Sequence, residues 1–510
     1  MRTVFSLLSM DILHFFPRWI FKKSQPVMDF GENELESPRQ SLKISLWARK
    51  GRSFYRGTMR YNRIVNSSCW RCRMNLSTVI GVDNGLIALF IFAAVLALIV
   101  FRRFMGVEFP IWTSMMVGAA LMIAAGVISV DEAYAAVDFD VLFFLVGMFS
   151  IVAGLERSGL LGYLMYRALA PAKSLRAVLV LFVFLMGALS AFTVNDTMAV
   201  VGTMIAITLV KQLALPLEVV LIGLAFSITV GSVMTPIGNP QNMLIASQSG
   251  MKAPFLSFVS VLGVPTLLNL AFVAAFLWFT LRRHGARLDG REVVIIGEEH
   301  IRIPSLARVS GASLCLAVGG FVVNDLFGVL GFPHTEHLGV IAFLASVPLY
   351  VLAKEKRELL RDVDWSTIVF FVAMFIVVGG LWSSGAAKTM LGMIPAPNPV
   401  DRGGAIVNIM LVGTVLSQVF SNVPLVKLYI EVMKGLGFNG SHQYAWLALA
   451  AGSTVAGNLT VLGAASNVII IEAAENRTGR SFTFKQFVKY GVVITAINVA
   501  TYTTWLLLFA

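Results

Sequence analysis

Long apolar segments recur from residue 83 to the end of the chain and restrict it to a small set of folds. The sequence has 510 residues, of which 57% are hydrophobic and only 13% are charged, about half the charged fraction of an ordinary soluble protein. Several apolar runs have the ~18 or more residues that a helix needs to cross a lipid bilayer. The sequence therefore predicts an all-α polytopic membrane protein, since a β-barrel would show short segments of alternating hydrophobicity.

The expected spans form two halves of matching order. The first half contains 84–101, 109–129, 139–155, 177–194 with a further apolar piece to about 210, 217–249 and 255–281. The second half contains 308–330, 337–353, 367–382, 404–420, 425–437, 444–471 and 486–509. In each half, two apolar pieces flank a polar interruption, and the long span that follows them is itself interrupted.

Residues 137–159 and 363–385 indicate that the second half repeats the first. Of these 23 aligned positions 11 are identical, and both stretches begin with Val-Asp and end with Ser-Gly. The identical pairs include Asp138 and Asp364, Met148 and Met374, and Gly154 and Gly380. Apolar stretches can agree by chance, but the shared ends and the constant offset favour a true repeat. The match continues at Gly238 and Gly463, and at Asn242 and Asn467, with an offset one residue shorter.

The distribution of Lys and Arg predicts how the spans are oriented. Basic residues concentrate in 157–176, 282–291, 354–361 and 477–485, and short basic loops remain in the cytoplasm. If the two pieces around residues 193–197 enter and leave the membrane on one side as a hairpin, each half makes five crossings. An odd number of crossings inverts the second half relative to the first, and such inverted-topology repeats are a common construction of transporters.

We therefore divide the chain into a basic tail (1–82), transmembrane repeat 1 (83–282), a cytoplasmic connector (283–306) and transmembrane repeat 2 (307–510). Residues 1–73 hold 14 Lys and Arg against 5 Asp and Glu, which is most of the net charge of +12. We expect the tail to be disordered, or to precede a true translation start near Met74. Because the positive charge is not gathered on a folded domain, no nucleic-acid partner is expected.

The three cysteines do not indicate a metal or redox centre. Cys69 and Cys72 have CxxC spacing, but no second Cys or His pair accompanies them. Cys315 lies in an apolar run and is expected to pack in the core. The chain has no GxxxxGK[ST], GxSxG or HExxH motif, so we expect no enzyme activity, no catalytic residues, no bound metal and no cofactor.

Four interruptions of the apolar spans are the candidate functional sites. Two are hairpin tips, Thr193-Val-Asn-Asp-Thr197 and Ser421-Asn-Val-Pro424, in which Asn195 is equivalent to Asn422. A helix that stops inside the membrane leaves backbone N–H or C=O groups without partners, and this is tolerated where the chain lines a cavity. Asn, Ser and Thr add neutral donors and acceptors. These residues also hold neighbouring helices together, but paired asparagines at paired breaks favour a binding site.

The other two interruptions lie within 217–249 and 444–471. Gly238 and Gly463 allow the backbone to approach a ligand closely, while Pro240 and Pro424 prevent continuous helices. With these four helix-breaking residues, the expected substrate-binding side chains are Thr193, Asn195, Thr197, Asn239, Gln241, Asn242, Ser421, Asn422, Ser466 and Asn467. No Lys or Arg lies at any break, so an anionic substrate would be held by helix dipoles and neutral donors.

Asp196 is the only carboxylate in either hairpin tip. An acidic side chain inside a membrane is costly and usually functional, so it is a candidate to carry a proton or to help bind Na⁺. The alternative is that Asp196 caps a helix that starts at Thr197.

These tip and break sequences resemble the ion transporter superfamily, in particular its citrate-transporter-like and arsenite-permease-like branch. The resemblance covers about residues 80–510 and rests on Asn195-Asp-Thr, Thr235-Pro-Ile-Gly-Asn-Pro-Gln-Asn, Phe420-Ser-Asn-Val-Pro and Ala456-Gly-Asn-Leu-Thr-Val-Leu-Gly-Ala-Ala-Ser-Asn. It implies a scaffold and a transport domain, two re-entrant hairpins, an elevator-like movement and often a homodimer.

The resemblance also implies two coupling-ion sites. One would be formed by Asn195, Asp196 and Gly238, and the other by Asn422 and Gly463. This chain departs from the Ser-Asn-Thr pattern that the family's symporters have at both tips, since it has Val194-Asn-Asp-Thr and Ser421-Asn-Val-Pro instead.

The sequence thus predicts a secondary active transporter of the bacterial inner membrane. It would move a small anion, either a carboxylate or an inorganic oxyanion, coupled to H⁺ or Na⁺, with membrane lipid around it. The alternatives are an arsenite or metalloid efflux permease, a Na⁺/H⁺ antiporter and, from a different class, an ion channel subunit.

Overall fold

The computed structural model describes residues 83–101, 110–283, 300–392 and 394–509. Its contacts separate Met1–Arg73 from Met74–Ala510, and all described residues belong to the second unit. The expectations for the basic tail, for Cys69 and Cys72, and for most of the connector 283–306 fall outside the described residues.

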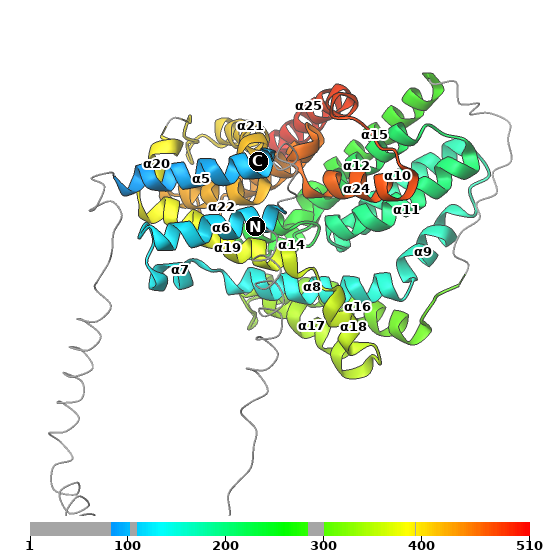
Figure 1. Ribbon diagram of the computed structural model, residues 1–510, viewed down its shortest axis with the longest axis horizontal. Coiled ribbons are helices and arrows are strands. Elements are labelled where there is room, and N and C mark those ends of the chain that lie inside the picture. The colour runs from blue at the N-terminus through cyan, green and yellow to red at the C-terminus, as the bar shows by residue number, and fades with distance from the viewer. Residues whose placement is uncertain (1–82, 102–109, 284–299, 393, 510) are drawn as a thin grey trace, which may run out of the picture. The chain divides into compact units, whose positions relative to one another are not determined.

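The described part of repeat 1 consists of helices (Figure 1). In chain order they are α5 (Asn84–Phe101), α6 (Ile111–Ala124), α7 (Val130–Ala136), α8 (Phe139–Arg157), α9 (Leu160–Leu169), α10 (Leu175–Phe192), α11 (Asn195–Leu213), α12 (Leu217–Gly231), η1 (Ser232–Met234), α13 (Pro240–Gln248), α14 (Pro254–Ser257), η2 (Phe258–Leu262) and α15 (Gly263–Arg283).

Repeat 2 follows the same order. Its helices are α16 (Pro304–Leu330), α17 (Leu338–Leu352), α18 (Lys356–Asp362), α19 (Trp365–Ser383), α20 (Ala386–Leu391), α21 (Arg402–Phe420), α22 (Asn422–Gly435), α23 (Gln443–Val455), η3 (Ala456–Asn458), η4 (Val461–Gly463), α24 (Ala465–Thr478) and α25 (Phe484–Phe509).

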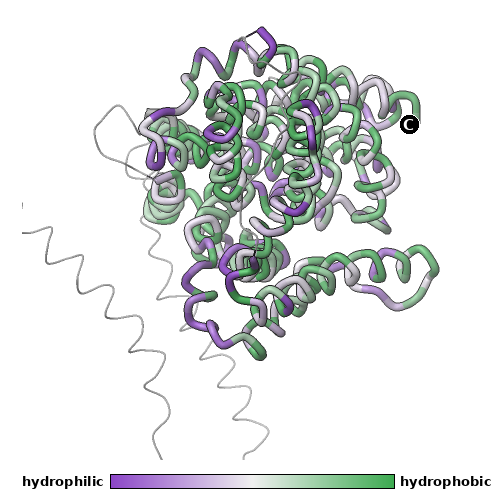
Figure 2. Tube along the Cα trace, turned by 90° about the vertical axis from the view of Figure 1, so that its right-hand side faces the viewer, coloured by the Kyte–Doolittle hydropathy of each residue, from purple (hydrophilic) through white to green (hydrophobic). Residues whose placement is uncertain are grey.

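The fold is that of a multi-pass membrane protein. Within the described ranges, nine helices are long and apolar enough to cross a membrane. Figure 2 shows hydrophobic residues along most of the helices, with hydrophilic residues gathered mainly in the connecting segments. The described part of the chain contains helices and no strand. The predicted all-α polytopic class, with two repeats that each contain a hairpin and an interrupted helix, is confirmed.

The structure corrects several details. Helix α16 begins at Pro304, so the last residues of the predicted connector belong to repeat 2, because Pro is favourable in the first turn of a helix. Cys315 is exposed on α16 rather than packed in the core, as is normal for an apolar side chain on a helix that faces lipid. The short helices α7, α9, α18 and α20 were not expected.

An aspartate directly before α8 and another directly before α19 show that the two halves start equivalent helices in the same way. Asp138 precedes α8 and its carboxylate accepts hydrogen bonds from the backbone of Asp140 at 3.0 Å and Val141 at 3.3 Å. Asp364 precedes α19 and accepts from the backbone of Thr367 at 3.1 Å. Each Asp therefore satisfies backbone donors that the start of a helix leaves open, as expected for N-cap residues.

Two hydrophobic cores hold the helices together, and the interrupted helices connect them. Helices α12 and α24 contribute to one core, whereas α13 and α23 contribute to the other. The chain passes from one core to the other at the break between α12 and α13, and returns in the opposite sense at the break between α23 and α24. The breaks therefore lie where the two cores meet.

Candidate ion and substrate site

The helix breaks that the sequence predicts are present in both repeats. In repeat 1, α12 ends at Gly231, a single 3₁₀ turn follows, and α13 begins only at Pro240. In repeat 2, α23 ends at Val455, two 3₁₀ turns follow, and α24 begins at Ala465. Neither Gly238 nor Gly463 lies in a continuous α-helix. Their backbone N–H groups donate instead to the Thr235 hydroxyl and to the carbonyl oxygen of Thr460, both at 3.0 Å.

Close backbone packing explains why glycine occupies the two central positions. A Cβ atom on Gly238 would overlap the carbonyl oxygen of Ser232, and one on Gly463 would lie 2.7 Å from the carbonyl oxygen of Ala456. Real Cβ contacts are not this short. Each break therefore folds back on the end of the helix before it, and only a residue without a side chain fits there.

One asparagine in each repeat holds the folded-back segment in the same way. The side-chain amide of Asn242 donates to the carbonyl oxygens of Ser232 and Thr235, both at 3.0 Å. The amide of Asn467 donates to the equivalent carbonyl oxygens, those of Gly457 at 2.7 Å and Thr460 at 3.4 Å. Both asparagines are fully buried. Their shared bonding shows that the sequence repeat is also a structural repeat.

The two breaks are joined by direct hydrogen bonds. The amide nitrogen of Asn239 lies 3.3 Å from the hydroxyl of Thr454, which in turn donates to the Oδ1 atom of Asn242 at 3.2 Å. Thr454 lies near the end of α23, in repeat 2. The break of repeat 1 is therefore bonded directly to the end of the helix that precedes the break of repeat 2, as a site shared by the two repeats requires.

The first hairpin tip joins the same network. The hydroxyl of Ser190, near the end of α10, donates to the Oδ1 atom of Asn195 at 2.6 Å and is 2.9 Å from the carbonyl oxygen of Ile228. The amide of Asn195 then donates to the hydroxyl of Ser232 at 3.2 Å, which also accepts from Asn239 at 3.2 Å. Asn195 of this tip is thus bonded both to the end of α10 and to the break of repeat 1.

The second hairpin tip is built differently. Ser421 has a φ of 66° and a ψ of 156°, a conformation that is strained for any residue except glycine. Asn422 begins α22 and is 7% exposed, and its Oδ1 atom is buried without a hydrogen-bond partner. Nearby, Gln418 donates to the carbonyl oxygen of Ala456 at 2.7 Å and accepts from Thr460 at 2.8 Å.

The remaining predicted residues lie around these tips and breaks. Thr193 is buried and donates to the carbonyl oxygen of Leu189 at 2.7 Å, within its own helix. Gln241 and Ser466 are buried in the first turns of α13 and α24. Pro424 is buried in the first turn of α22, and Thr197 is half-buried near the start of α11.

Asp196 does not act as a helix cap. Helix α11 begins at Asn195 with Val194 in the cap position, so Asp196 is the second residue of the helix. A carboxylate in the first turn still interacts favourably with the positive end of the helix dipole. The alternative prediction of Asp196 as the N-cap is therefore wrong, while its role in coupling stays a prediction.

Sequence reasoning missed several polar residues of the network. Ser190, Ser232, Thr454 and Gln418 lie inside apolar helices or directly after them, where a single Ser, Thr or Gln is common. The repeat gave one usable signal, because Ser190 and Ser417 each lie five residues before the tip asparagine. Thr229 and Thr454 each lie nine residues before the central glycine.

A charged cluster beside the second tip was also missed. The amine of Lys427, on α22, donates to the Oε1 atom of Gln248 at 2.9 Å and to Glu431 at 2.8 Å. Gln248 ends α13, and its amide donates to the carboxylate of Asp138. These four residues connect the start of α8 to both half-helices, α13 and α22.

Taken together, the site offers neutral oxygen and nitrogen atoms and the starts of half-helices. Helices α11, α22 and α24 each begin without a side-chain cap, so their first N–H groups lack the partner that a cap would supply. Among the described residues, no group of three or more His, Cys, Asp or Glu side chains could hold a metal ion. The arrangement is suited to binding small solutes and ions between two repeats of a membrane protein, which is the construction of a secondary transporter.

Comparison with known proteins gives the family. The model of the citrate transporter family matches residues 96–456, so the chain belongs to this family and is a transporter rather than an enzyme. An uncharacterized transporter of Mycobacterium tuberculosis is 28% identical over 400 residues, covering 75% of this chain and 90% of that protein. The silicon efflux transporter LSI3 of Oryza sativa subsp. japonica is 28% identical over 443 residues, covering 75% of this chain and 90% of that protein.

A solved structure supports the fold. The YdaH transporter of Alcanivorax borkumensis, described as having an unusual topology, superimposes with a TM-score of 0.51 at 15% sequence identity. The match covers 83% of this chain and 98% of that one. At this level of identity the likeness concerns the fold alone.

Proposed function

We propose that this protein is a secondary active transporter that moves a small anion, a carboxylate or an inorganic oxyanion, across the bacterial inner membrane. Transport is coupled to Na⁺ or H⁺ by alternating access. The observation that carries the proposal is the junction of the two broken helices through Asn239, Asn242 and Thr454. A solute held there contacts both repeats, so its binding is sensitive to their relative position.

The polar groups around this junction favour a small anion. Helices α11, α22 and α24 begin without side-chain caps, and a helix start attracts negative charge through its open N–H groups. The side chains of Gln241 and Ser466 lie in the first turns of α13 and α24 and add neutral donors. Neutral groups bind an anion weakly enough to release it on the other side.

A second candidate is the efflux of a metalloid oxyacid or of arsenite. The comparison with the silicon efflux transporter of rice favours it, and neutral donors suit a weakly acidic solute as well as an anion. A Na⁺/H⁺ antiporter is the third candidate within the same family, and a homodimer within the lipid bilayer is the expected assembly.

The test is transport in proteoliposomes that contain the purified full-length protein. A thermal-shift screen against organic acids, sulfate, phosphate, silicate and arsenite selects the solute, and its labelled form is then followed under a Na⁺ or a pH gradient. We expect saturable, gradient-driven accumulation that Asn239→Ala reduces at least tenfold. Asn398→Ala, in an exposed loop, is the matched control. Current without a coupling gradient would instead identify a channel.

A further inference from the structure

A cavity of about 530 Å³ lies between α21 and α25, two helices of repeat 2 that are in contact with each other. Helix α21 supplies Val407, Leu411 and Thr414 to its wall, Leu459 comes from the break of repeat 2, and the other lining residues belong to α25 between 492 and 504. We call this cavity the α21–α25 groove. Its volume is within the range of about 300–1,000 Å³ that is usual for ligand sites, and none of the predicted binding residues lines it.

A difference between the repeats explains why the two helices leave a groove. The alignment that pairs Ser190 with Ser417 and Asn269 with Asn498 also pairs Gly187 with Thr414 and Leu270 with Val499. In repeat 1, Leu270 of α15 packs directly on Gly187 of α10, since a Cβ atom added to Gly187 would lie 2.7 Å from its Cδ1 atom. Thr414 and Val499 both line the groove. A side chain in place of glycine holds α21 away from α25, and the shorter valine does not fill the gap.

The groove faces the lipid bilayer. Leu411 is 51% exposed and Val492 is 50% exposed, and both helices are long and apolar enough to cross a membrane. The lining residues, which all lie in the described part of the chain, include none with a charge. Because apolar cavities are not filled by water, the occupant of this groove has to be apolar and has to come from the membrane.

The length of the groove matches the depth of one lipid leaflet. Val492 and Thr504 are 12 residues apart on α25, which is about 18 Å along a helix, and half of the hydrocarbon core measures about 15 Å. At one end, directly after Thr504, the Trp505 ring lies 4.5 Å from that of Phe509, and aromatic residues of this kind mark the membrane surface. The groove therefore runs inward from the surface.

The other end of the groove lies against the break of repeat 2. A Cβ atom added to Gly491, the residue before Val492, would lie 2.9 Å from the carbonyl oxygen of Leu459. Leu459 is followed by Thr460, whose hydroxyl donates to Gln418 at 2.8 Å. A chain that fills the groove would therefore touch the break from its lipid side.

A basic residue lies at the surface end. Arg402 is exposed and is the first residue of α21, and the next residue is close to the end of α25, because a Cβ atom added to Gly403 would lie 3.6 Å from Leu507. The carboxylate of Asp401 is directed at the start of its own helix, where it accepts from the backbone of Gly404 at 2.9 Å. An arginine in this place suits the phosphate of a lipid headgroup.

From these observations we propose that the α21–α25 groove binds one acyl chain of a membrane phospholipid, whose phosphate is held by Arg402. The other apolar occupant available in a membrane is a helix of a second copy of the chain. Such a helix is about 10 Å wide and crosses both leaflets, whereas the groove ends at Leu459. The inference goes beyond the proposed function and does not depend on the solute or on the coupling ion.

Photolabelling of the purified full-length protein tests this inference. The protein is reconstituted with phosphatidylglycerol that carries a diazirine at the end of one acyl chain, and the labelled residues are mapped by mass spectrometry. Leu459 is only half-buried, but it lies between α21 and α25, where a lipid that merely surrounds the protein does not reach. We expect labelling of Leu459 and of the groove wall to exceed labelling of the exposed face of α16 at least fivefold.

A pair of variants separates the groove from the general lipid surface. Ala496→Leu combined with Val499→Leu introduces the residues that repeat 1 has at the equivalent positions and fills the groove, so labelling of Leu459 should fall at least fivefold. Ala312→Leu, on the exposed face of α16, adds the same kind of side chain elsewhere and should leave labelling of Leu459 unchanged.

A third variant tests the headgroup without changing any packed residue. Unlabelled phosphatidylglycerol should compete with the probe at least fivefold more strongly than diacylglycerol does, because only the former has a phosphate. In Arg402→Gln this difference should disappear. This comparison also decides the question if the groove-filling variant does not fold.

Four results would overturn the inference: equal labelling of all lipid-facing helices, labelling of Leu459 that the groove-filling variant does not reduce, equal competition by the two lipids in the unmodified protein, or a preference for phosphatidylglycerol that Arg402→Gln retains. Crosslinks between the α21 or α25 helices of two protein copies would assign the groove to a second copy instead. None of these measurements involves a transported solute, so their failure would leave the proposed transport function intact.

Discussion

Glycine at the centre of each break shows how a single residue determines where a membrane helix stops. Replacing Gly238 by Ala would place a Cβ atom on the carbonyl oxygen of Ser232, so the segment would have to move away from the end of α12. Such overpacking typically destabilises by about 1–3 kcal/mol, and the movement would also displace Asn239. We expect Gly238→Ala to lower the midpoint of thermal unfolding and to reduce transport more than tenfold.

Gly319 provides the matched control for that prediction. It lies on α16, and no atom comes within 4 Å of the position that a Cβ atom would take there. Gly319→Ala should therefore be neutral or stabilise by up to ~1 kcal/mol through its higher helix propensity. Equal effects of the two substitutions would show that Gly238 is replaceable, and that the folded-back geometry does not depend on it.

At the same scale, the sequence predicted the asparagines at the interruptions of the apolar spans, but not the residues to which they are hydrogen-bonded. Asn195, Asn242 and Asn467 stood out because polar residues at paired interruptions of membrane spans are rare outside binding sites. Ser232 and Thr454 did not, since one hydroxyl in an apolar helix can bond to its own backbone. Only the fold brings Thr454 of repeat 2 against Asn239 of repeat 1. The two residues are 215 positions apart in the sequence, so no local sequence pattern predicts their contact.

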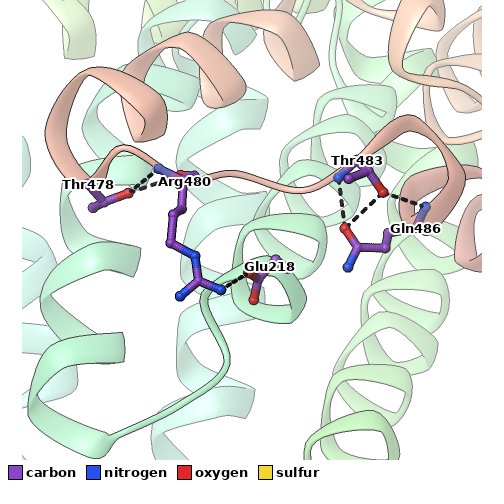
Figure 3. Close-up of polar contacts among 5 residues, drawn as sticks. All are labelled: Glu218, Thr478, Arg480, Thr483 and Gln486. Atoms are coloured by element: carbon purple, nitrogen blue, oxygen red, sulfur yellow. Dashed lines mark hydrogen bonds and ion pairs between the residues drawn. The ribbon is translucent and has the colours of Figure 1, made fainter.

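Among the elements, α25 shows how a long terminal helix is started by its own side chains. Thr483 and Gln486 bond reciprocally, the backbone of Thr483 to the Oε1 atom of Gln486 at 2.8 Å and the backbone of Gln486 to the Thr483 hydroxyl at 3.3 Å (Figure 3). This is a capping box. We expect Thr483→Ala to lower the free energy of unfolding by about 0.5–2 kcal/mol, measured by denaturation in detergent.

The neighbouring ion pair serves as the comparison. Arg480 reaches Glu218 at 3.1 Å, but its side chain is 76% exposed (Figure 3), and exposed pairs contribute about 0–1 kcal/mol. Arg480→Gln should therefore change stability less than Thr483→Ala does. The reverse order would mean that the contact between the end of α24 and the start of α12 is the more important one.

Element positions were predicted well where length and apolarity decide them, as for α5, α8 and α21. The unexpected α7 has a capping box of its own, formed by Ser129 and Glu132, but its seven residues are too few to show helical periodicity. The sequence places the start of α16 too late, because Pro304 and Ser305 resemble the connector before them.

Across the whole molecule, the two repeats differ in the hydrogen bonding of their polar side chains at the candidate site between them. Both use Asn242 or Asn467 to hold a folded-back segment. The Ser190 and Asn195 side chains of the first copy are hydrogen-bonded to each other, whereas the equivalent Ser417 hydroxyl and Asn422 Oδ1 atom of the second have no partner among the described residues. The strained Ser421 belongs to the second copy, and strain of this kind tends to persist where function requires it. The two halves therefore differ in how far their equivalent polar side chains are hydrogen-bonded.

The cluster around Lys427 connects that shared site to the rest of the protein. Gln248 joins Asp138 at the start of α8 to Lys427 on α22, so it links α8 to both half-helices. Hydrogen bonds to charged groups contribute about 1.5–3 kcal/mol each. We expect Gln248→Leu to lower the free energy of unfolding by about 2 kcal/mol and to change the transport rate.

Ser247→Ala on the same helix separates this effect from a general weakening of α13. The Ser247 hydroxyl donates only within its own helix, to Leu244 at 3.2 Å, so its loss should change stability by less than ~0.5 kcal/mol. If Gln248→Leu weakened solute binding in the thermal-shift assay as strongly as Asn239→Ala does, the cluster would be part of the binding site. If it changed only stability and rate, as expected, α8 would act as the fixed support against which the half-helices move.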